Sequence, residues 1–207
     1  MTSFLQQGRS PLILGSSSKT RARILERAGL EFRALAPDLD EAAMCAAMGD
    51  ENALDPSDVA EVLARAKAEA ISHLAREAIV VGGDQVLSMD GRIFGKPRSM
   101  EEARTQLLDL SGKTHQLHTS VALAKNAVTV WAETDVVTLT MRRLSPEFIG
   151  RYLATSGEAV LGSVGAYQIE ALGIQLFEKI DGDFFSILGL PLLPVLDALR
   201  REGAIEG

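Results

Sequence analysis

The apolar run IVVGGDQVL, from Ile79 to Leu87, constrains the fold of this chain more than any other segment. Its isoleucine and valines are typical of a buried strand, yet two glycines and the ionisable Asp84 interrupt them. Glycines allow a backbone or a ligand to come close, whereas an acid is costly in a dry strand. A plain turn residue is the simpler reading of Asp84, but apolar residues flank it on both sides. We therefore interpret Asp84 as the centre of an active site.

Local signals predict helices and strands without strict alternation or a fixed-period repeat. Helices are predicted over residues 19–29, 57–77, 99–112, 145–157 and 190–203. Strands are predicted over residues 11–15, 30–37, 114–125 and 128–141. Residues 78–94 are predicted as a strand, a break and a hairpin turning at Asp90–Gly91, and residues 173–185 as a strand and a turn. We expect an α/β or α+β sandwich around a mixed sheet, with residues 1–207 forming one domain or two lobes that share a core.

The longest predicted helix carries a lysine next to its apolar side. Ser57 is the expected N-cap of this helix. Its apolar face is expected to hold Val59, Val62, Leu63, Ala66, Ala70 and Leu74. Lys67 lies beside that face, where a lysine stem commonly covers apolar surface without any function. Lys96, in the segment FGKP, is expected from its pattern alone to be a surface residue.

Composition and charge exclude several classes of protein. Hydrophobic residues make up 46% and charged residues 24% of the chain, a balance typical of soluble globular proteins. We expect no membrane partner, because no apolar run approaches the roughly 20 residues of a membrane helix, and no secretory signal. The net charge of −7 argues against a nonspecific grip on nucleic acid. A single cysteine, Cys45, suits a cytoplasmic protein, and a homodimer remains open.

The segment GSSSKTRARIL places a strand end, a serine-rich loop and a helix start in sequence. That order directs backbone amides and the positive end of a helix dipole to one point, which suits phosphate. Ser16 and Ser18 add hydroxyls, and Arg21 adds a guanidinium that can hold two phosphate oxygens. An ordinary serine-capped helix explains the same pattern equally well. The segment SGKTH (residues 111–115) resembles a P-loop in three letters only, and we interpret it as a helix stop followed by a strand.

Carboxylates follow two predicted strands. Asp38, Asp40 and Glu41 follow one strand, and Asp84 lies at the expected break of another. Acids from separate strand ends can meet in one crevice and hold Mg²⁺ or Mn²⁺ through oxygen. For Asp38 and Asp40 we prefer turn and helix-cap roles. His115 and His118 are expected to point to opposite sides of a strand, so both are interpreted as structural.

Taken in order, these segments resemble the family of Maf-type nucleoside triphosphate pyrophosphatases, associated with septum formation. The segments that carry the resemblance are GSSSKTRARIL, DLDE, ARAKAEA, GGDQ, GKP, LSGKTH and GLPL. They run from about residue 12 to residue 203, and the ordered set is far more specific than any single motif. The resemblance implies an α/β fold in which a mixed, twisted sheet is flanked by helices and two lobes surround a central cleft.

The resemblance also implies an activity and roles for named residues. The reaction is hydrolysis of a nucleoside triphosphate to the monophosphate and pyrophosphate with a divalent metal cation, Mg²⁺ or Mn²⁺. Asp84 matches the proton acceptor, and Glu41 matches its acidic partner; both are candidate metal ligands. The positions that match triphosphate contacts are Ser16, Ser18, Arg21, Lys67 and Lys96.

Three residues bear on the preferred base. Gln85 in GGDQ and Glu170 in YQIEALG match the 7-methyl-GTP-like subtype. A carboxylate at Glu170 can accept hydrogen bonds from the N1–H and 2-amino groups of guanine. Thr20, in contrast, stands where that subtype often has a large aromatic residue, and the segment GAYQI is similar to dTTP- and UTP-hydrolysing members. A dTTP/UTP enzyme and a nucleotide-binding regulator of septum formation and cell division are therefore kept as alternatives.

Overall fold

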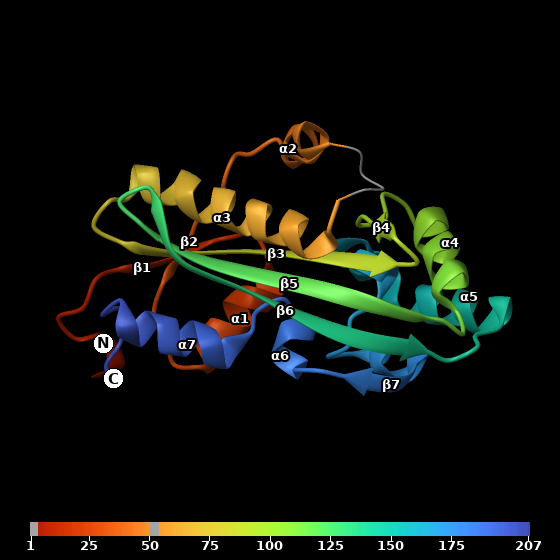
Figure 1. The fold of residues 1–207 in the computed structure, drawn as a ribbon. Coiled ribbons are helices and arrows are strands. Elements are labelled where there is room, and N and C mark those ends of the chain that lie inside the picture. Colours follow the sequence, from red (N-terminus) through yellow and green to blue (C-terminus); the bar gives the residue numbers. More distant parts are fainter. Residues whose placement is uncertain (1–3, 50–53) are drawn as a thin grey trace.

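The computed structural model describes residues 4–49 and 54–207 of the chain. Within these residues, seven strands form one sheet in the order β2-β1-β3-β5-β6-β7, with β4 paired to β3 outside that path. The pairs β1–β2 and β1–β3 are parallel, and the pairs that link β3, β4, β5, β6 and β7 are antiparallel. The predicted mixed, twisted sheet flanked by helices is confirmed (Figure 1).

The bounds of the longer elements follow the local sequence signals. The strands are β1 (Leu12–Gly15), β2 (Arg33–Ala34), β3 (Ile79–Met89), β4 (Arg92–Phe94), β5 (Thr114–Lys125), β6 (Val128–Met141) and β7 (Phe177–Asp181). The α-helices are α1 (Lys19–Arg27), α2 (Glu41–Met48), α3 (Pro56–Leu74), α4 (Met100–Leu110), α5 (Pro146–Ser156), α6 (Phe184–Ile187) and α7 (Leu192–Arg201). Short 3-10 helices are η1 (Phe4–Gln6), η2 (Gly157–Gly162), η3 (Val164–Ala166) and η4 (Leu172–Leu176).

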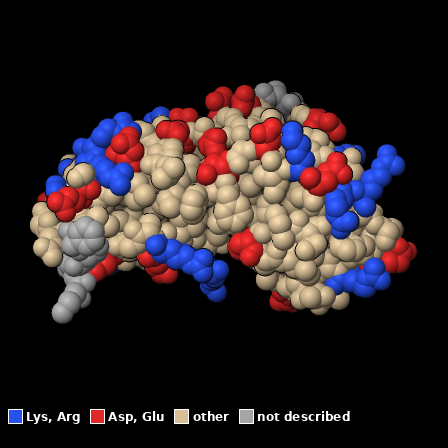
Figure 2. Space-filling view, turned by 90° about the horizontal axis from the view of Figure 1, so that it is seen from below, with Lys and Arg blue, Asp and Glu red and all other residues tan. Residues whose placement is uncertain are grey.

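The two faces of the sheet are covered differently. Helix α3 lies along one face, while α1 and α7 cover the other face near β1, and α4 and α5 lie at the far end (Figure 1). Seen from the side of α1, α6 and α7, the middle of the molecule is largely uncharged, with charged side chains mainly toward its margins (Figure 2). No helix of the described residues is long and apolar enough to cross a membrane.

Two apolar cores are present on the face opposite α3. One core gathers around α1, α7 and the start of β3; it includes Leu14, Leu25, Val81, Val195 and Leu199. The other gathers around α4, α5 and the end of β3; it includes Leu87, Leu107, Leu139, Ile149 and Leu176. Because side chains alternate along a strand, Gly83 and Gln85 of β3 face the same side between these cores. The polar segment of β3 thus lies between two apolar cores, and a division of the chain into two lobes stays a prediction.

Three local expectations were wrong. Strand β3 continues through Gly82, Gly83 and Asp84 without the predicted break. The N-cap of α3 is Asp55, whose side chain accepts a hydrogen bond from the backbone N–H of Ser57 at 2.7 Å. The strand predicted over residues 30–37 is limited to the two residues of β2.

The buried face of α3 also differs from the expected one. Val62 and Leu74 are exposed, whereas the buried residues are Val59, Ala60, Leu63, Ala64, Lys67, Ala68, Ile71 and Ser72. Small residues form the contact because the helix backbone lies very close to the sheet. A Cβ atom on Gly82 would lie 2.4 Å from the carbonyl oxygen of Ala64. Gly82 is therefore required for the close approach of α3, and this approach places Lys67 on the buried side.

Candidate active site

A gap in strand pairing exposes the polar segment of β3. Strand β1 pairs with β3 only as far as Gly15, opposite Gly82, and β4 pairs with β3 only from Leu87 onward. Within the described residues, the edge of β3 from residue 83 to residue 86 therefore has no strand beside it on this side. Asp84 and Gln85 are partly exposed there, so the gap explains how a central strand can carry an acid.

A buried lysine joins the two predicted catalytic acids. Lys67 Nζ donates a hydrogen bond to Asp84 Oδ1 at 2.6 Å and lies 2.9 Å from Glu41 Oε1. The side chains of Lys67 and Asp84 are 10% and 13% exposed, and that of Glu41 is 50% exposed. The two carboxylates thus come from different elements, β3 and the first turn of α2, and meet at one ammonium group.

Arg21 occupies the opposite side of β3. Its Nε donates to the carbonyl oxygen of Gly189 at 2.6 Å, and its Nη1 donates to Ser16 Oγ at 3.2 Å. Burial lowers the pKa of Arg21, and the nearby carboxylates of Asp84 and Glu41 oppose that effect. Gly83 leaves room for this guanidinium, because a Cβ atom there would lie 3.2 Å from Arg21 Nε. The two adjacent glycines therefore make room for different groups: Gly82 for helix α3 and Gly83 for the guanidinium of Arg21.

The serine-rich loop between β1 and α1 is held by its own hydroxyl groups. Ser18 is the N-cap of α1 and accepts from the backbone N–H of Arg21 at 3.3 Å. Ser16 Oγ accepts from the backbone N–H of Ser18 at 3.2 Å. The segment is therefore a serine-capped helix start that also lines the cleft described next, while its binding of phosphate stays a prediction.

All five predicted triphosphate-binding residues and both acids line one cleft of about 830 Å³. Lys96 reaches the cleft from the loop after β4. The lining also includes Ser17, Cys45, Phe94, Glu158, Gln168 and Gly189. A volume of this order accommodates a nucleotide-sized ligand. The structure thus brings these residues together, while their individual catalytic roles stay predictions.

The three predicted specificity residues are distributed over two cavities. Thr20 and Gln85 line the cleft, and Thr20 also lines a neighbouring cavity of about 430 Å³. Glu170 lines only the smaller of these two cavities. The amide nitrogen of Gln85 is turned toward Thr119 Oγ1 at 2.8 Å and toward the carbonyl oxygens of Ser186 and Ile187, each at 3.0 Å. Gln85 therefore fixes α6 to the sheet. Its role in the choice of base stays a prediction.

Sequence reasoning missed two aromatic residues of the smaller cavity, Phe184 and Phe185. The available signal was an adjacent aromatic pair directly after Asp183, a helix-capping residue whose side chain accepts from Ser186 N. The two histidines interpreted as structural contact different neighbours. His115 contacts Tyr167 Oη at 2.9 Å, and His118 lies between Ser57 Oγ and Ser88 Oγ at 2.8 and 2.9 Å.

The donor set suits a metal that arrives with the substrate. Among the described residues, no three His, Cys, Asp or Glu side chains are grouped to hold a metal ion. Glu41 and Asp84 supply carboxylate oxygens within the cleft. Mg²⁺ is usually bound by one or two carboxylates together with substrate phosphates and water, so two acids are sufficient for that mode of binding.

Comparison with known proteins identifies the family. A family model described as Maf-like protein matches residues 11–202. Similar curated proteins are a 7-methyl-GTP pyrophosphatase of Brucella suis, a 7-methyl-GTP pyrophosphatase of Mesorhizobium japonicum and a nucleoside triphosphate pyrophosphatase of Bradyrhizobium diazoefficiens. Their identities to this chain are 51%, 50% and 46%, over 95%, 95% and 97% of this chain and 98% of each relative. A match over nearly the whole chain, together with the geometry of the cleft, shows that this protein belongs to the Maf family.

Proposed function

We propose that the protein hydrolyses a nucleoside triphosphate to the nucleoside monophosphate and pyrophosphate. The observation that carries this proposal is the meeting of Asp84 and Glu41 at the Lys67 ammonium, 2.6 and 2.9 Å away, inside a cleft lined with basic residues. Pure binding of an anion does not need two carboxylates in the site. Chemistry on a phosphate does, because water must be oriented and its proton accepted. The names of the relatives support the same reaction.

In the proposed reaction, the oxygen of water forms a bond to the α-phosphorus, and the bond between the α-phosphorus and the α–β bridging oxygen breaks. The pyrophosphate leaves with that oxygen. Asp84 orients the water and takes its proton, since it is largely enclosed and held by Lys67. Basic groups on opposite sides of β3, among them Lys67 and Arg21, hold the triphosphate in line and offset its negative charge.

The metal in this proposal is Mg²⁺ or Mn²⁺, held by Glu41 and Asp84. Bound there, it would supply positive charge to the phosphate oxygens and activate water. Lys67 competes for the same two carboxylates, with which it is paired at 2.9 and 2.6 Å. We therefore expect metal binding to depend on the triphosphate, whose oxygens complete the ligand set.

The proposed substrate is a modified purine nucleotide of the 7-methyl-GTP type. The similar Brucella and Mesorhizobium proteins carry the name 7-methyl-GTP pyrophosphatase. Glu170 offers a carboxylate acceptor in the cavity next to the cleft, which suits the donor edge of guanine. With such a substrate, the proposed role of the protein is to remove unwanted nucleotides. The proposed location is the cytoplasm, which the single cysteine suits.

The test is product analysis on a nucleotide panel with Mg²⁺ or Mn²⁺, comprising 7-methyl-GTP, GTP, dTTP, UTP and CTP. We expect monophosphate and pyrophosphate in equal amounts, greatest turnover with 7-methyl-GTP, and no activity after chelation of the metal. In ¹⁸O-labelled water, the label should enter the monophosphate. Release of inorganic phosphate, or label in pyrophosphate, would contradict attack at the α-phosphorus. Tight binding without any hydrolysis would instead favour a nucleotide-binding regulator of cell division. A preference for dTTP or UTP would favour the dTTP/UTP-hydrolysing subtype.

A further inference from the structure

The smaller cavity lies beside the cleft and has a different character. Thr20 and Leu188 line both cavities, so the two are neighbours. The smaller one, of about 430 Å³, has mainly apolar walls contributed by α1, α6 and α7. Its further lining residues are Arg23, Ile24, Arg27, Ala28, Glu170, Phe184, Phe185 and Leu192. A ligand with its phosphates in the cleft can therefore extend an apolar part into this second cavity.

Two aromatic side chains stand exposed in the smaller cavity. Phe184 and Phe185 are 48% and 37% exposed, although large apolar side chains are more stable when buried. Their ring centroids lie 6.4 Å apart and the rings are inclined by 70°. The pair therefore presents one ring face and a neighbouring ring edge. A flat aromatic ligand can stack on the face and meet the edge, two arrangements that aromatic rings prefer.

Helix α6, which carries these rings, is fixed from the side of the sheet. The carbonyl oxygen of Ser186 accepts from Gln85 Nε2 at 3.0 Å and from Thr119 Oγ1 at 2.8 Å. The carbonyl oxygen of Gly189, just after the helix, accepts from Arg21 Nε at 2.6 Å. The backbone of the helix that carries the rings is thus held by polar contacts, including contacts from Gln85 and Arg21 of the cleft. A preorganised aromatic surface loses little entropy on binding a ligand.

We propose that Phe184 and Phe185 form the wall on which the base of the nucleotide stacks, so that this pair sets the preference for purines. The inference rests on the proposed function, because the cleft must hold the triphosphate. Glu170 lines the same cavity and can accept hydrogen bonds from the edge of the stacked base. The two phenylalanine rings carry no charge, so stacking is the interaction that they supply to the base.

The test replaces the rings while keeping their apolar bulk. Phe184→Leu and Phe185→Leu, singly and together, are compared with Phe184→Tyr, which keeps the ring, and with Phe148→Leu on α5, outside both cavities. The first readout is kcat/KM for 7-methyl-GTP, GTP and UTP. The double leucine variant should lose roughly tenfold to a hundredfold with both purines, mainly through KM, and much less with UTP. Phe184→Tyr and Phe148→Leu should keep the ratios of the unchanged protein.

A second readout separates this inference from the proposed function. Binding of the same nucleotides is measured by equilibrium dialysis in an Asp84→Asn background, where turnover is not required. Absence of pyrophosphate release from the unchanged protein would defeat the proposed function, and dialysis would still decide the role of the rings. Unchanged purine affinity in the folded double leucine variant would overturn the inference. An equal loss with all nucleotides, accompanied by a change in oligomer mass, would also overturn it, because the rings would then serve a contact between copies.

Discussion

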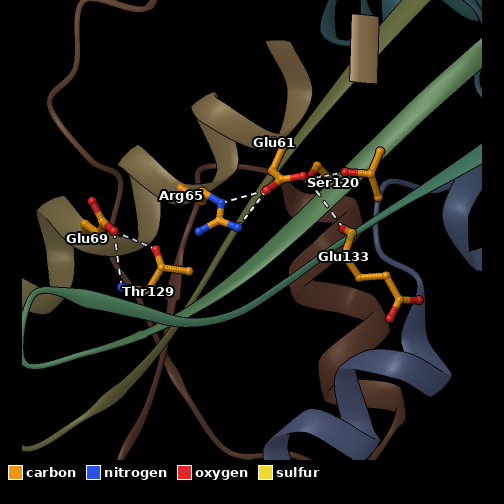
Figure 3. A network of polar contacts seen from close by, with 7 residues as sticks. Glu61, Arg65, Glu69, Ser120, Thr129 and Glu133 are labelled. Atoms are coloured by element: carbon orange, nitrogen blue, oxygen red, sulfur yellow. Dashed lines mark hydrogen bonds and ion pairs between the residues drawn. The ribbon is translucent and has the colours of Figure 1, made fainter. Parts of the chain in front are cut away.

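Two ion pairs on helix α3 have nearly the same length and opposite surroundings. Lys67 Nζ lies 2.6 Å from Asp84 Oδ1, with side chains 10% and 13% exposed. The outer pair is Arg65 and Glu61, in which Arg65 Nη2 lies 2.7 Å from Glu61 Oε1 and the side chains are 44% and 37% exposed (Figure 3). Distance alone would rank the two pairs as equals. Water screens the outer pair, whereas the inner pair is largely removed from solvent except where the cleft opens.

The comparison shows what a buried charge contributes. An exposed pair adds little to stability, because its ions are well solvated when apart. In the inner pair, each ion depends on the other, since removal of one leaves a charge with little water. Glu41 shares the same ammonium, so the inner group carries one more acid than base. Such an arrangement is costly for stability alone and is useful where carboxylates must act on a bound substrate.

The largest effect is expected from breaking the inner pair at its basic partner. Lys67→Met should destabilise the protein by about 3 kcal/mol, because Asp84 then lacks its partner, and turnover should be lost. In Lys67→Met/Asp84→Asn, both charges are absent, so most of the stability should return without turnover. Urea unfolding of the two single variants and the double variant measures this coupling. Additive changes in the free energy of unfolding would mean that the inner pair is no stronger than the outer one.

The next effect concerns the distance between α3 and the sheet. Gly82→Ala places a Cβ atom 2.4 Å from the carbonyl oxygen of Ala64, so the helix must move outward. We expect a loss of about 2 to 3 kcal/mol in unfolding free energy and a fall in activity, because Lys67 is carried away from Asp84. Gly162→Ala is the matched control, since a Cβ atom there meets no atom within 4 Å. Equal stability of the two variants would contradict the close contact.

A third prediction extends the comparison to a buried group without a charged partner. His115 is 1% exposed, and burial lowers its pKa from 6.5 to about 4. The unfolded chain therefore binds this proton at a higher pH than the folded chain does. Stability is complete above pH 6.5 and falls as the pH drops toward 4, with a loss of about 2 kcal/mol from this residue at pH 5.

The variant His115→Phe/Tyr167→Phe removes both partners of the hydrogen bond and should flatten this pH dependence. Its free energy of unfolding at pH 7.5 and pH 5, compared with that of the unchanged protein, gives the contribution. A residual slope is expected from His118, whose pKa burial also lowers and Asp55 raises in part. If the unfolding free energy of the double variant depended on pH as strongly as that of the unchanged protein, the lowered pKa of His115 would not be the cause.

The smallest effect is expected from the outer pair. Arg65→Ala should change the free energy of unfolding by only about 0.3 to 0.5 kcal/mol, because the pair is exposed and joins residues four apart on one helix. The change should shrink further at high salt, where surface charges are screened. Turnover should not change, as neither residue lines the cleft. A loss similar to that of Lys67→Met would remove the distinction between the pairs.

Local sequence signals were sufficient where one short segment determines the structure. Ser99 caps α4, and Ser145 with Pro146 begins α5, as predicted. The Asp90–Gly91 turn joins β3 to β4, and both residues have positive φ values, 52° and 77°. Each of these features depends on backbone groups within a few residues, so the sequence states them directly.

Contacts between distant segments were harder to predict. The uninterrupted β3 depends on the fit of Gly82 against α3, which no local pattern reports. That same fit buries Lys67 and leaves Val62 at the surface, against the apolar periodicity of the helix. Asp84 was identified from its own neighbours, whereas Lys67 and Lys96 were assigned only through the family resemblance. Phe184 and Phe185 were missed, because their exposure is a property of the assembled cavity.

The catalytic role of Asp84 is tested most directly by the turnover of Asp84→Asn with the preferred nucleotide, measured together with its thermal unfolding. Asp90→Asn, in the turn at the end of the same strand, is the matched control. We expect Asp84→Asn to stay folded and to lose on the order of 10²- to 10⁴-fold in kcat, while Asp90→Asn keeps its activity. Full turnover by folded Asp84→Asn would show that the acid at the centre of the cleft has no part in the chemistry.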